Sequence, residues 1–243
     1  MAVKSNWFLR GKEVFDKKKQ LDVVAKARKE RYIQRFFLKA GESAKIVFVD
    51  SEPFGIWEHN LRIDGKWGNF YTCCKEIQPC PICKNFPESR PTWTVYFTVL
   101  DLRPYTKRDG QTVKFRKILY PAKGSTIAKI EDLLNKYGSI SGLCFKVSRL
   151  TDDDSNCGRD FEYIGKVDIV KKFGKEYAIP IDYAKVLAFP NDEELEYLGI
   201  SSDMAVNIED DEEHELDDNA ILDDVTEPVE EVAEEVDIDD LVE

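Results

Sequence analysis

Four potential metal ligands lie within a segment of hairpin size, and this segment limits the possible folds more than any other part of the sequence. Two residues separate Cys80 from Cys83, six separate Cys73 from Cys80, and thirteen separate His59 from Cys73. The two-residue spacing lets both thiolates reach one ion. Three thiolates and one imidazole complete a tetrahedron with no open position, which is typical of a structural zinc ion. The sequence therefore predicts one structural zinc bound by His59, Cys73, Cys80 and Cys83.

Two other interpretations of these cysteines have to be weighed. Cys80 and Cys83 have the spacing of a redox dithiol, and adjacent Cys73 and Cys74 have the character of buried apolar residues. A thioredoxin-like site would need a βαβ pattern around the dithiol, and the flanking sequence has none. Zinc is therefore the favoured interpretation, and the choice of ligands stays open in one respect: Cys74 is an alternative to His59 or Cys73.

The order and spacing of these motifs resemble the zinc-binding subdomain of the helix-destabilising, single-stranded DNA-binding proteins of tailed bacteriophages. The resemblance extends over residues 56 to 103 and rests on His59, Gly65-Lys66-Trp67, Thr72-Cys73 and Cys80-Pro81-Ile82-Cys83. It implies an OB-fold core with zinc held by one histidine and three cysteines. It also implies a basic N-terminal arm for cooperative self-association and an acidic C-terminal tail that recruits replication proteins.

Charge is divided unevenly along the chain. The formal net charge is −12, yet residues 191–243 contain 24 of the 47 acidic residues and no Lys or Arg. Residues 1–190 therefore carry 35 basic and 23 acidic residues, a net charge of +12. A basic body with an acidic tail predicts a nucleic-acid partner, with the tail as an interaction arm or an internal competitor.

The same division suggests three segments. Residues 1–33 read as a basic, mostly helical arm with a thin apolar stripe. This arm is either a solvated helix or a segment that contacts a neighbouring protomer along the DNA or the DNA phosphates. The family's basic-Ser-Thr signature does not follow Lys17-Lys18-Lys19. Residues 34–190 form the core, with the zinc hairpin inserted at about 56–90. Residues 191–243 form an acidic, largely disordered tail, and its end, with Asp237, Ile238, Asp239, Asp240 and Leu241, is the expected partner-binding peptide.

The core sequence is dominated by short segments of strand character with one helix among them. The helix is expected from Ser125, as its N-cap, to Tyr137, with Gly138 as its stop. This pattern fits a mainly β fold, a five-stranded Greek-key barrel of the OB type, better than a sandwich. Strands are expected at 36–38, 44–50, 54–59, 92–103, 112–120, 143–150, 161–168 and 177–179.

Basic and aromatic residues alternate in the segments that would line a groove. Binding of single strands needs cations for the phosphates and aromatic faces for the bases. Trp93 and Phe97 are assigned to the core instead. The candidate DNA contacts are Arg62, Lys66, Trp67 and Tyr71 at the hairpin, Arg90, Tyr96, Arg103, Tyr105, Lys107 and Arg108 on the long strand and its tip, and Lys114, Arg116 and Tyr120 on the returning strand.

These features predict a sequence-nonspecific single-stranded DNA-binding protein that acts in phage DNA replication, recombination and repair. No catalytic triad, phosphate loop or tight carboxylate cluster suggests an enzyme. No apolar stretch resembles a signal peptide or a membrane span, and cysteines grouped as ligands indicate a reducing cytoplasm, that of the bacterial host for a phage protein. The alternatives are a zinc-ribbon transcription or replication factor that binds duplex DNA, and a protein-interaction adaptor.

Overall fold

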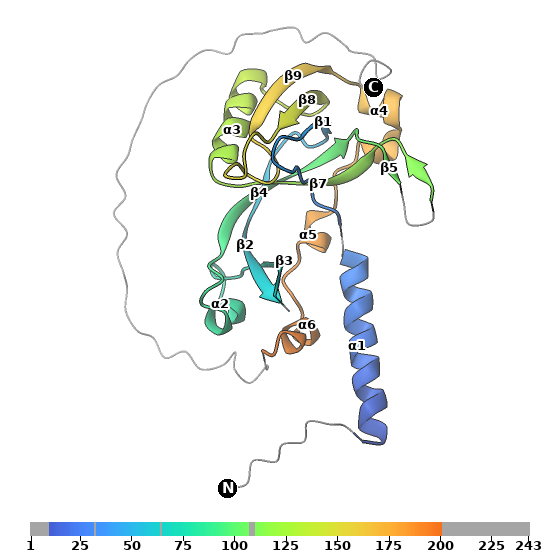
Figure 1. The fold of residues 1–243 in the computed structure, drawn as a ribbon, viewed down its shortest axis with the longest axis vertical. Helices are drawn as coiled ribbons and strands as arrows, with labels where there is room; N and C mark the ends of the chain where they lie inside the picture. Colours follow the sequence, from blue (N-terminus) through green and yellow to red (C-terminus); the bar gives the residue numbers. More distant parts are fainter. Residues whose placement is uncertain (1–9, 32, 64, 107–109, 201–243) are drawn as a thin grey trace, which may run out of the picture. The chain divides into compact units, whose positions relative to one another are not determined.

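The computed structural model describes residues 10–31, 33–63, 65–106 and 110–200 (Figure 1). Among these residues the chain divides into two compact units. One, here called the metal unit, comprises residues 10–31, 59–90 and 184–200; the other, the sheet unit, comprises residues 33–58 and 91–183. Strand β2 begins in the sheet unit and ends in the metal unit. None of the described helices is long and apolar enough to cross a membrane.

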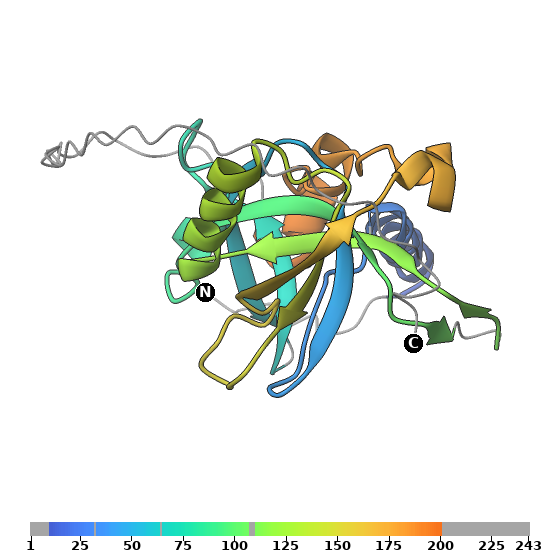
Figure 2. The same cartoon turned by 90° about the horizontal axis from the view of Figure 1, so that it is seen from above.

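The fold is mainly β, with a seven-stranded antiparallel sheet (Figures 1 and 2). The strand order is β3-β2-β4-β1-β8-β9, and β7 pairs with the other edge of β4. A separate two-stranded sheet pairs β5 with β6. The strands are β1 (Ser43–Phe48), β2 (Phe54–Ile63), β3 (Lys66–Thr72), β4 (Thr92–Asp101), β5 (Tyr105–Thr106), β6 (Thr112–Val113), β7 (Arg116–Ala122), β8 (Leu143–Ser148) and β9 (Asp160–Lys166).

Two apolar clusters hold the sheet unit together, and β4 contributes to both. Val95, Phe97 and Val99 join the larger cluster, while Leu100 joins the smaller one. Strand β4 is therefore buried on both faces, and the assignment of Phe97 to the core is confirmed. Helix α3 (Ser125–Tyr137) contributes Ile130 to the larger cluster, and Ile127, Leu133 and Leu134 pack against it, which is the apolar face that the sequence period predicts.

Helix α3 lies where the sequence predicts it, but its N-cap residue is not the predicted one. Gly124, not Ser125, occupies the N-cap position, and no side chain caps the helix. Gly138 ends it with a φ of 68°, a left-handed conformation that suits glycine. The remaining helices of the sheet unit are short: α4 (Ile169–Phe173) and the 3₁₀ helix η1 (Lys175–Tyr177).

Three of the expected strands are corrected by the structure. Residues 36–38 form no strand, and Arg35 makes only an isolated bridge to Leu119. Residues 177–179 are not extended, because Tyr177 ends η1. The expected strand 112–120 is interrupted at residues 114–115, which divides it into β6 and β7.

The metal unit is built from a hairpin and four helices. Strands β2 and β3 are joined at Gly65, whose φ of 76° fits the predicted Asp64-Gly65 turn, while Asp64 itself lies outside the described residues. The hydroxyl of Thr72, at the end of β3, donates a hydrogen bond of 2.5 Å to the carbonyl of Leu187. This bond ties the segment 184–200 to the hairpin. The helices are α1 (Lys12–Arg31), α2 (Pro81–Asn85), α5 (Tyr183–Val186), which begins in the sheet unit, and α6 (Asp192–Tyr197).

The basic arm and the start of the acidic tail are both helical where the structure describes them. Helix α1 spans 20 residues, in agreement with the expected helical arm. Helix α6 begins with a capping box in which Asn191 and Glu194 bond each other's backbone amides. Residues 192–197, at the start of the tail that is expected to be largely disordered, are thus helical. Residues 201–243, which include the predicted partner-binding peptide from Asp237 to Leu241, lie outside the described residues.

Candidate metal centre and nucleic-acid surface

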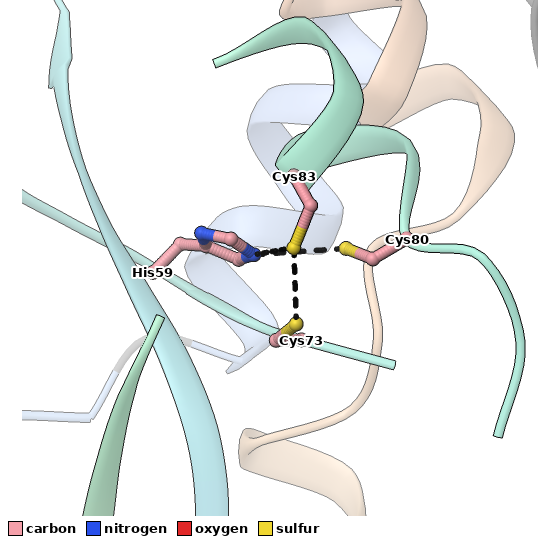
Figure 3. Close-up of side chains that lie close together, drawn as sticks. All are labelled: His59, Cys73, Cys80 and Cys83. Carbon is pink, nitrogen blue, oxygen red and sulfur yellow. Dashed lines mark hydrogen bonds between the residues drawn. The ribbon is translucent and has the colours of Figure 1, made fainter. Parts of the chain in front are cut away.

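The four predicted metal ligands converge at one place in the metal unit (Figure 3). His59 projects from β2 and Cys73 follows the end of β3. Cys80 is the N-cap residue of α2, and Cys83 lies within that helix. Pro81 suits the first turn of a helix because its missing N–H would have no partner there. The hairpin and the short helix thus each supply two ligands.

The distances between the ligand atoms fit a single zinc ion. With Zn–S bonds of about 2.3 Å and a Zn–N bond of about 2.0 Å, tetrahedral geometry separates two sulfurs by about 3.8 Å and nitrogen from sulfur by about 3.5 Å. Nε2 of His59 lies 3.4 Å from Sγ of Cys83 and 3.6 Å from Sγ of Cys80. Sγ of Cys73 lies 3.6 Å from Sγ of Cys83. All four ligand atoms lie within 4.8 Å of one another, as a shared ion requires.

The surroundings of His59 orient its ring for a metal. His59 is fully buried, and its Nδ1 lies 2.7 Å from the carbonyl oxygen of Ser89. Because a carbonyl only accepts, Nδ1 carries the proton and Nε2 presents its lone pair to the three sulfurs. Ser89 is held in turn, since its hydroxyl donates to the carbonyl of Asn60 at 3.0 Å.

The thiols differ in acidity. Burial by itself raises the pKa of Cys80, but the hydrogen bond between Cys80 and His59 and those from backbone amides, among them those of Cys83 and Ile82, outweigh it and lower the pKa to about 6. Burial raises the pKa of Cys83 to about 12 and raises that of Cys73 above its ordinary value. The lowered pKa of Cys80 favours its thiolate, which is the form that binds a metal ion, whereas Cys73 and Cys83 would lose their protons on binding one.

Cys74 is not a member of this cluster. Its thiol is buried, and burial raises its pKa to about 11. The backbone carbonyl of Cys74 accepts hydrogen bonds of 2.9 Å from the amides of both Ile77 and Gln78, so this residue shapes the turn that leads to Cys80. The geometry therefore favours His59 and Cys73 over Cys74 as ligands.

The metal unit exposes part of the predicted DNA-binding set. The ring of Trp67 on β3 is 60% exposed, and Arg62 and Arg90 are exposed as well. Arg62 donates from Nε to the carbonyl of Gly65 at 3.2 Å, which holds its guanidinium close to the hairpin turn. Tyr71 is half-buried. Lys66 begins β3, and its side chain lies outside the described part of the unit.

The sheet unit carries a second part of this set. Arg103 and Arg116 are half-buried and both bond to Asp101, while Lys114 is exposed. The guanidinium carbon of Arg116 lies 4.6 Å from the ring centroid of Tyr105. These side chains gather where β4 ends and β7 begins. The predicted contacts Lys107 and Arg108 lie outside the described residues.

The prediction that Tyr96 and Tyr120 contact DNA is wrong. Both are fully buried, so neither can present its ring to a base. Tyr96 lies on β4, both faces of which are covered, and its hydroxyl donates to Glu58. Tyr120 lies on β7, where three successive residues, Ile118, Leu119 and Tyr120, are buried, and its ring joins the larger apolar cluster. Its hydroxyl donates to the carbonyl of Gly158 at 3.1 Å.

The assignment of Trp93 to the core is also wrong, since this side chain is 40% exposed. Trp93 pairs with Trp57 across the β2–β4 ladder, with ring centroids 5.5 Å apart. Its ring also covers Gly55, where an added Cβ would lie 2.5 Å from a ring atom. Trp93 thus shields the backbone of β2 at a glycine and leaves part of its ring in solvent.

The positions of two residues of interest, Phe37 and Asp101, were not predicted from the sequence. Phe37 is 48% exposed, although its neighbours Phe36 and Leu38 are buried. Period-two alternation of these three apolar residues was a signal that could have found it. Asp101 is fully buried between two arginines. No local pattern marks that role, because Arg116 is brought to Asp101 only by the pairing of β4 with β7.

Comparison of the chain with protein-family models, with curated proteins and with solved structures found no significant match.

Proposed function

We propose that this protein binds single-stranded DNA without sequence preference, coating and protecting it during phage replication, recombination and repair. The observation that carries the proposal is the presence of both aromatic rings and cationic side chains at the surface of each unit. The metal unit exposes Trp67 together with Arg62, and the sheet unit presents Tyr105 beneath Arg116. Stacking on aromatic rings contributes about 1–3 kcal/mol per base and is indifferent to sequence.

An OB fold for the sheet unit supports this function. In such a fold the first strand pairs with the second and the fourth, the second with the third, and the fourth with the fifth. If β1, β4, β7, β8 and β9 are taken as these five strands, all four pairings are present. Helix α3 lies between β7 and β8, where an OB fold carries its helix. We infer a partly open OB barrel from this agreement.

We infer that the ion of the metal unit is zinc, because three thiolates and one imidazole at these separations are the donor set and spacing that zinc prefers. Zinc would be bound by His59, Cys73, Cys80 and Cys83 and would supply no chemistry beyond holding these side chains together. By fixing the hairpin it would hold Arg62 and Trp67 in place for DNA.

The acidic tail is the proposed docking segment for replication proteins such as polymerase, helicase or primase components. The charges themselves support this role, since 24 carboxylates without a basic residue cannot assist DNA binding directly. Asp237, Ile238, Asp239, Asp240 and Leu241 alternate apolar and acidic side chains, as a short recognition peptide does. The basic helix α1 is the proposed contact between neighbouring protomers on DNA.

Binding of the full-length protein to a single-stranded oligonucleotide and to the duplex of the same sequence, at one salt concentration, tests the proposal. We expect the single strand to bind at least about tenfold more tightly, because only unpaired bases can stack on protein rings. Tighter binding of the duplex would favour a zinc-ribbon factor. Absence of binding to both would favour a protein-interaction adaptor.

A further inference from the structure

One buried carboxylate holds two arginines at the surface of the sheet unit. Asp101 is fully buried and accepts hydrogen bonds of 2.9 Å from both Nε and Nη2 of Arg103. Arg116 donates to the same carboxylate from Nη2 at 2.7 Å and to Oε1 of Gln34 from Nη1 at 2.9 Å. The two guanidinium groups are thus fixed side by side, and their charges exceed that of Asp101.

Aromatic rings complete this arrangement. The guanidinium carbon of Arg103 lies 5.0 Å from the ring centroid of buried Phe36, and that of Arg116 lies 4.6 Å from the centroid of Tyr105. Nη2 of Arg103 also donates to the backbone carbonyl of Phe37 at 3.2 Å. The exposed side chain of Phe37 therefore belongs to a segment that is bonded directly to one of the arginines.

The arginines retain donors for a ligand. Within the described part of the chain, Nη1 of Arg103 makes no hydrogen bond. Nε of Arg116 is buried without a partner, so a ligand can be reached only by the second N–H groups of its Nη1 and Nη2. The side chains of Arg103 and Arg116 are 31% and 22% exposed, so solvent reaches both. A pair of guanidinium groups with unused N–H donors is suited to phosphate oxygens.

We propose that this cluster is a nucleotide subsite in which Arg103 and Arg116 bind a backbone phosphate and Phe37 stacks on the adjoining base. Asp101 is its positioning residue: it touches no DNA but holds both guanidinium groups in place before the strand arrives. Preorganisation of this kind removes the entropic cost of ordering two long side chains on binding. The subsite rests on the proposed single-strand function and assigns part of that function to specific groups.

A substitution of Asp101 tests the proposal, because the positioning role and simple charge attraction predict opposite changes in DNA affinity. Removing a negative charge strengthens binding to a polyanion if only net charge matters. Removing the anchor of two arginines weakens binding if their positions matter. Asp101→Asn therefore separates the two accounts, and Asp132→Asn, at an exposed carboxylate of α3 in the same unit, is the matched control for charge.

The experiment measures the affinity of the full-length variants for an oligonucleotide short enough to hold one protein, together with the thermal unfolding of each free protein. We expect Asp101→Asn to bind about five- to a hundredfold more weakly than the native protein, which is the cost of ordering two rotamer-rich side chains. Asp132→Asn should bind as tightly as the native protein or slightly more tightly. An Asp101→Asn protein that matches Asp132→Asn would overturn the positioning role.

Phe37 provides a second test that does not depend on a buried residue. Phe37→Leu should lose about five- to a hundredfold in affinity, because it removes one stacked base. Phe37→Tyr keeps the ring and should retain the native affinity. Equal affinities of these two variants would overturn the subsite even if Asp101→Asn fails to fold. A native protein that does not bind the oligonucleotide would overturn the proposed function itself.

Discussion

Glu58 is a buried carboxylate whose charge is balanced by its neighbours. Its side chain is 1% exposed and accepts hydrogen bonds of 2.7 and 3.0 Å from Arg35 and of 3.1 Å from Lys123. The hydroxyl of Tyr96 donates to it as well. Burial alone raises the pKa of Glu58, but the hydrogen bonds and charges of Arg35 and Lys123 outweigh burial and hold the pKa below its ordinary value. Glu58 is therefore ionised in the folded protein at neutral pH.

Glu58→Gln should destabilise the protein by about 3 kcal/mol, because it leaves two cations without their counterion in a buried site. Glu162→Gln is the matched control, since Glu162 pairs with Lys146 at 3.5 Å while 72% exposed, and exposed pairs contribute about 1 kcal/mol or less. Urea unfolding of both variants measures the difference. Equal loss of stability in the two variants would show that burial of Glu58 adds nothing.

The ligand assignment leads to a prediction about metal content. The native protein should contain one zinc per chain, and Cys80→Ser should lose most of it, because Cys80 is the thiol with the lowest pKa in the cluster. Cys74→Ser should keep its zinc, since Cys74 lies outside the cluster. Elemental analysis of the three purified proteins decides the matter. Loss of zinc from the Cys74 variant would show that Cys74 is a ligand and that the proposed ligand set is wrong.

At the scale of elements, the metal unit and the sheet unit have different sources of stability. Both apolar clusters consist of residues of the sheet unit. The hairpin β2–β3 and helix α2 contribute only Leu61 and Ile82 as fully buried aliphatic side chains among their described residues. With so small an apolar contribution, a metal ion bound at the cluster would be the main link between these elements.

Chelation should therefore open the metal unit selectively. Hydrogen exchange followed by mass spectrometry, with and without a chelator, should show lost protection in residues 59–86 and retained protection in β4, β7 and β8. The physical reason is that no ligand of the cluster lies in those three strands. Parallel loss of protection in all of these segments would mean that the metal supports the whole fold.

Part of the site and of the fold could be predicted from the sequence. The ligand set follows from spacing, because a two-residue gap and a preceding hairpin restrict where thiols can lie. The burial of Tyr120 and the exposure of Trp93 could not be predicted in this way. Tyr120 is buried because both faces of β7 are covered at this point, and the ring of Trp93 lies over Gly55 of the neighbouring strand. Alternation predicts a face only while a strand is regular. Burial of β4 on both faces likewise depends on elements distant in sequence.

At the scale of the whole molecule, opposite charges are joined in one chain. A tail segment tethered to a basic body is held at a high effective concentration and competes with DNA phosphates for the same cations. Deleting the chain from Asp210 onward should therefore tighten binding to single strands, most at low salt where screening is weakest, and should abolish recruitment of replication proteins. Titrations of both proteins at two salt concentrations measure the effect. Equal affinities at low salt would show that the tail does not compete.

The proposed function requires that the protein hold single strands by their phosphates, whatever their bases. Its most direct test is the affinity of the full-length protein for single strands of equal length and different base sequence, measured over a range of salt concentrations. The account predicts that the logarithm of the affinity falls linearly with the logarithm of salt, with a slope of about −0.7 per phosphate neutralised and nearly the same slope for every sequence. A flat salt dependence, or a slope that changes with base sequence, would contradict it.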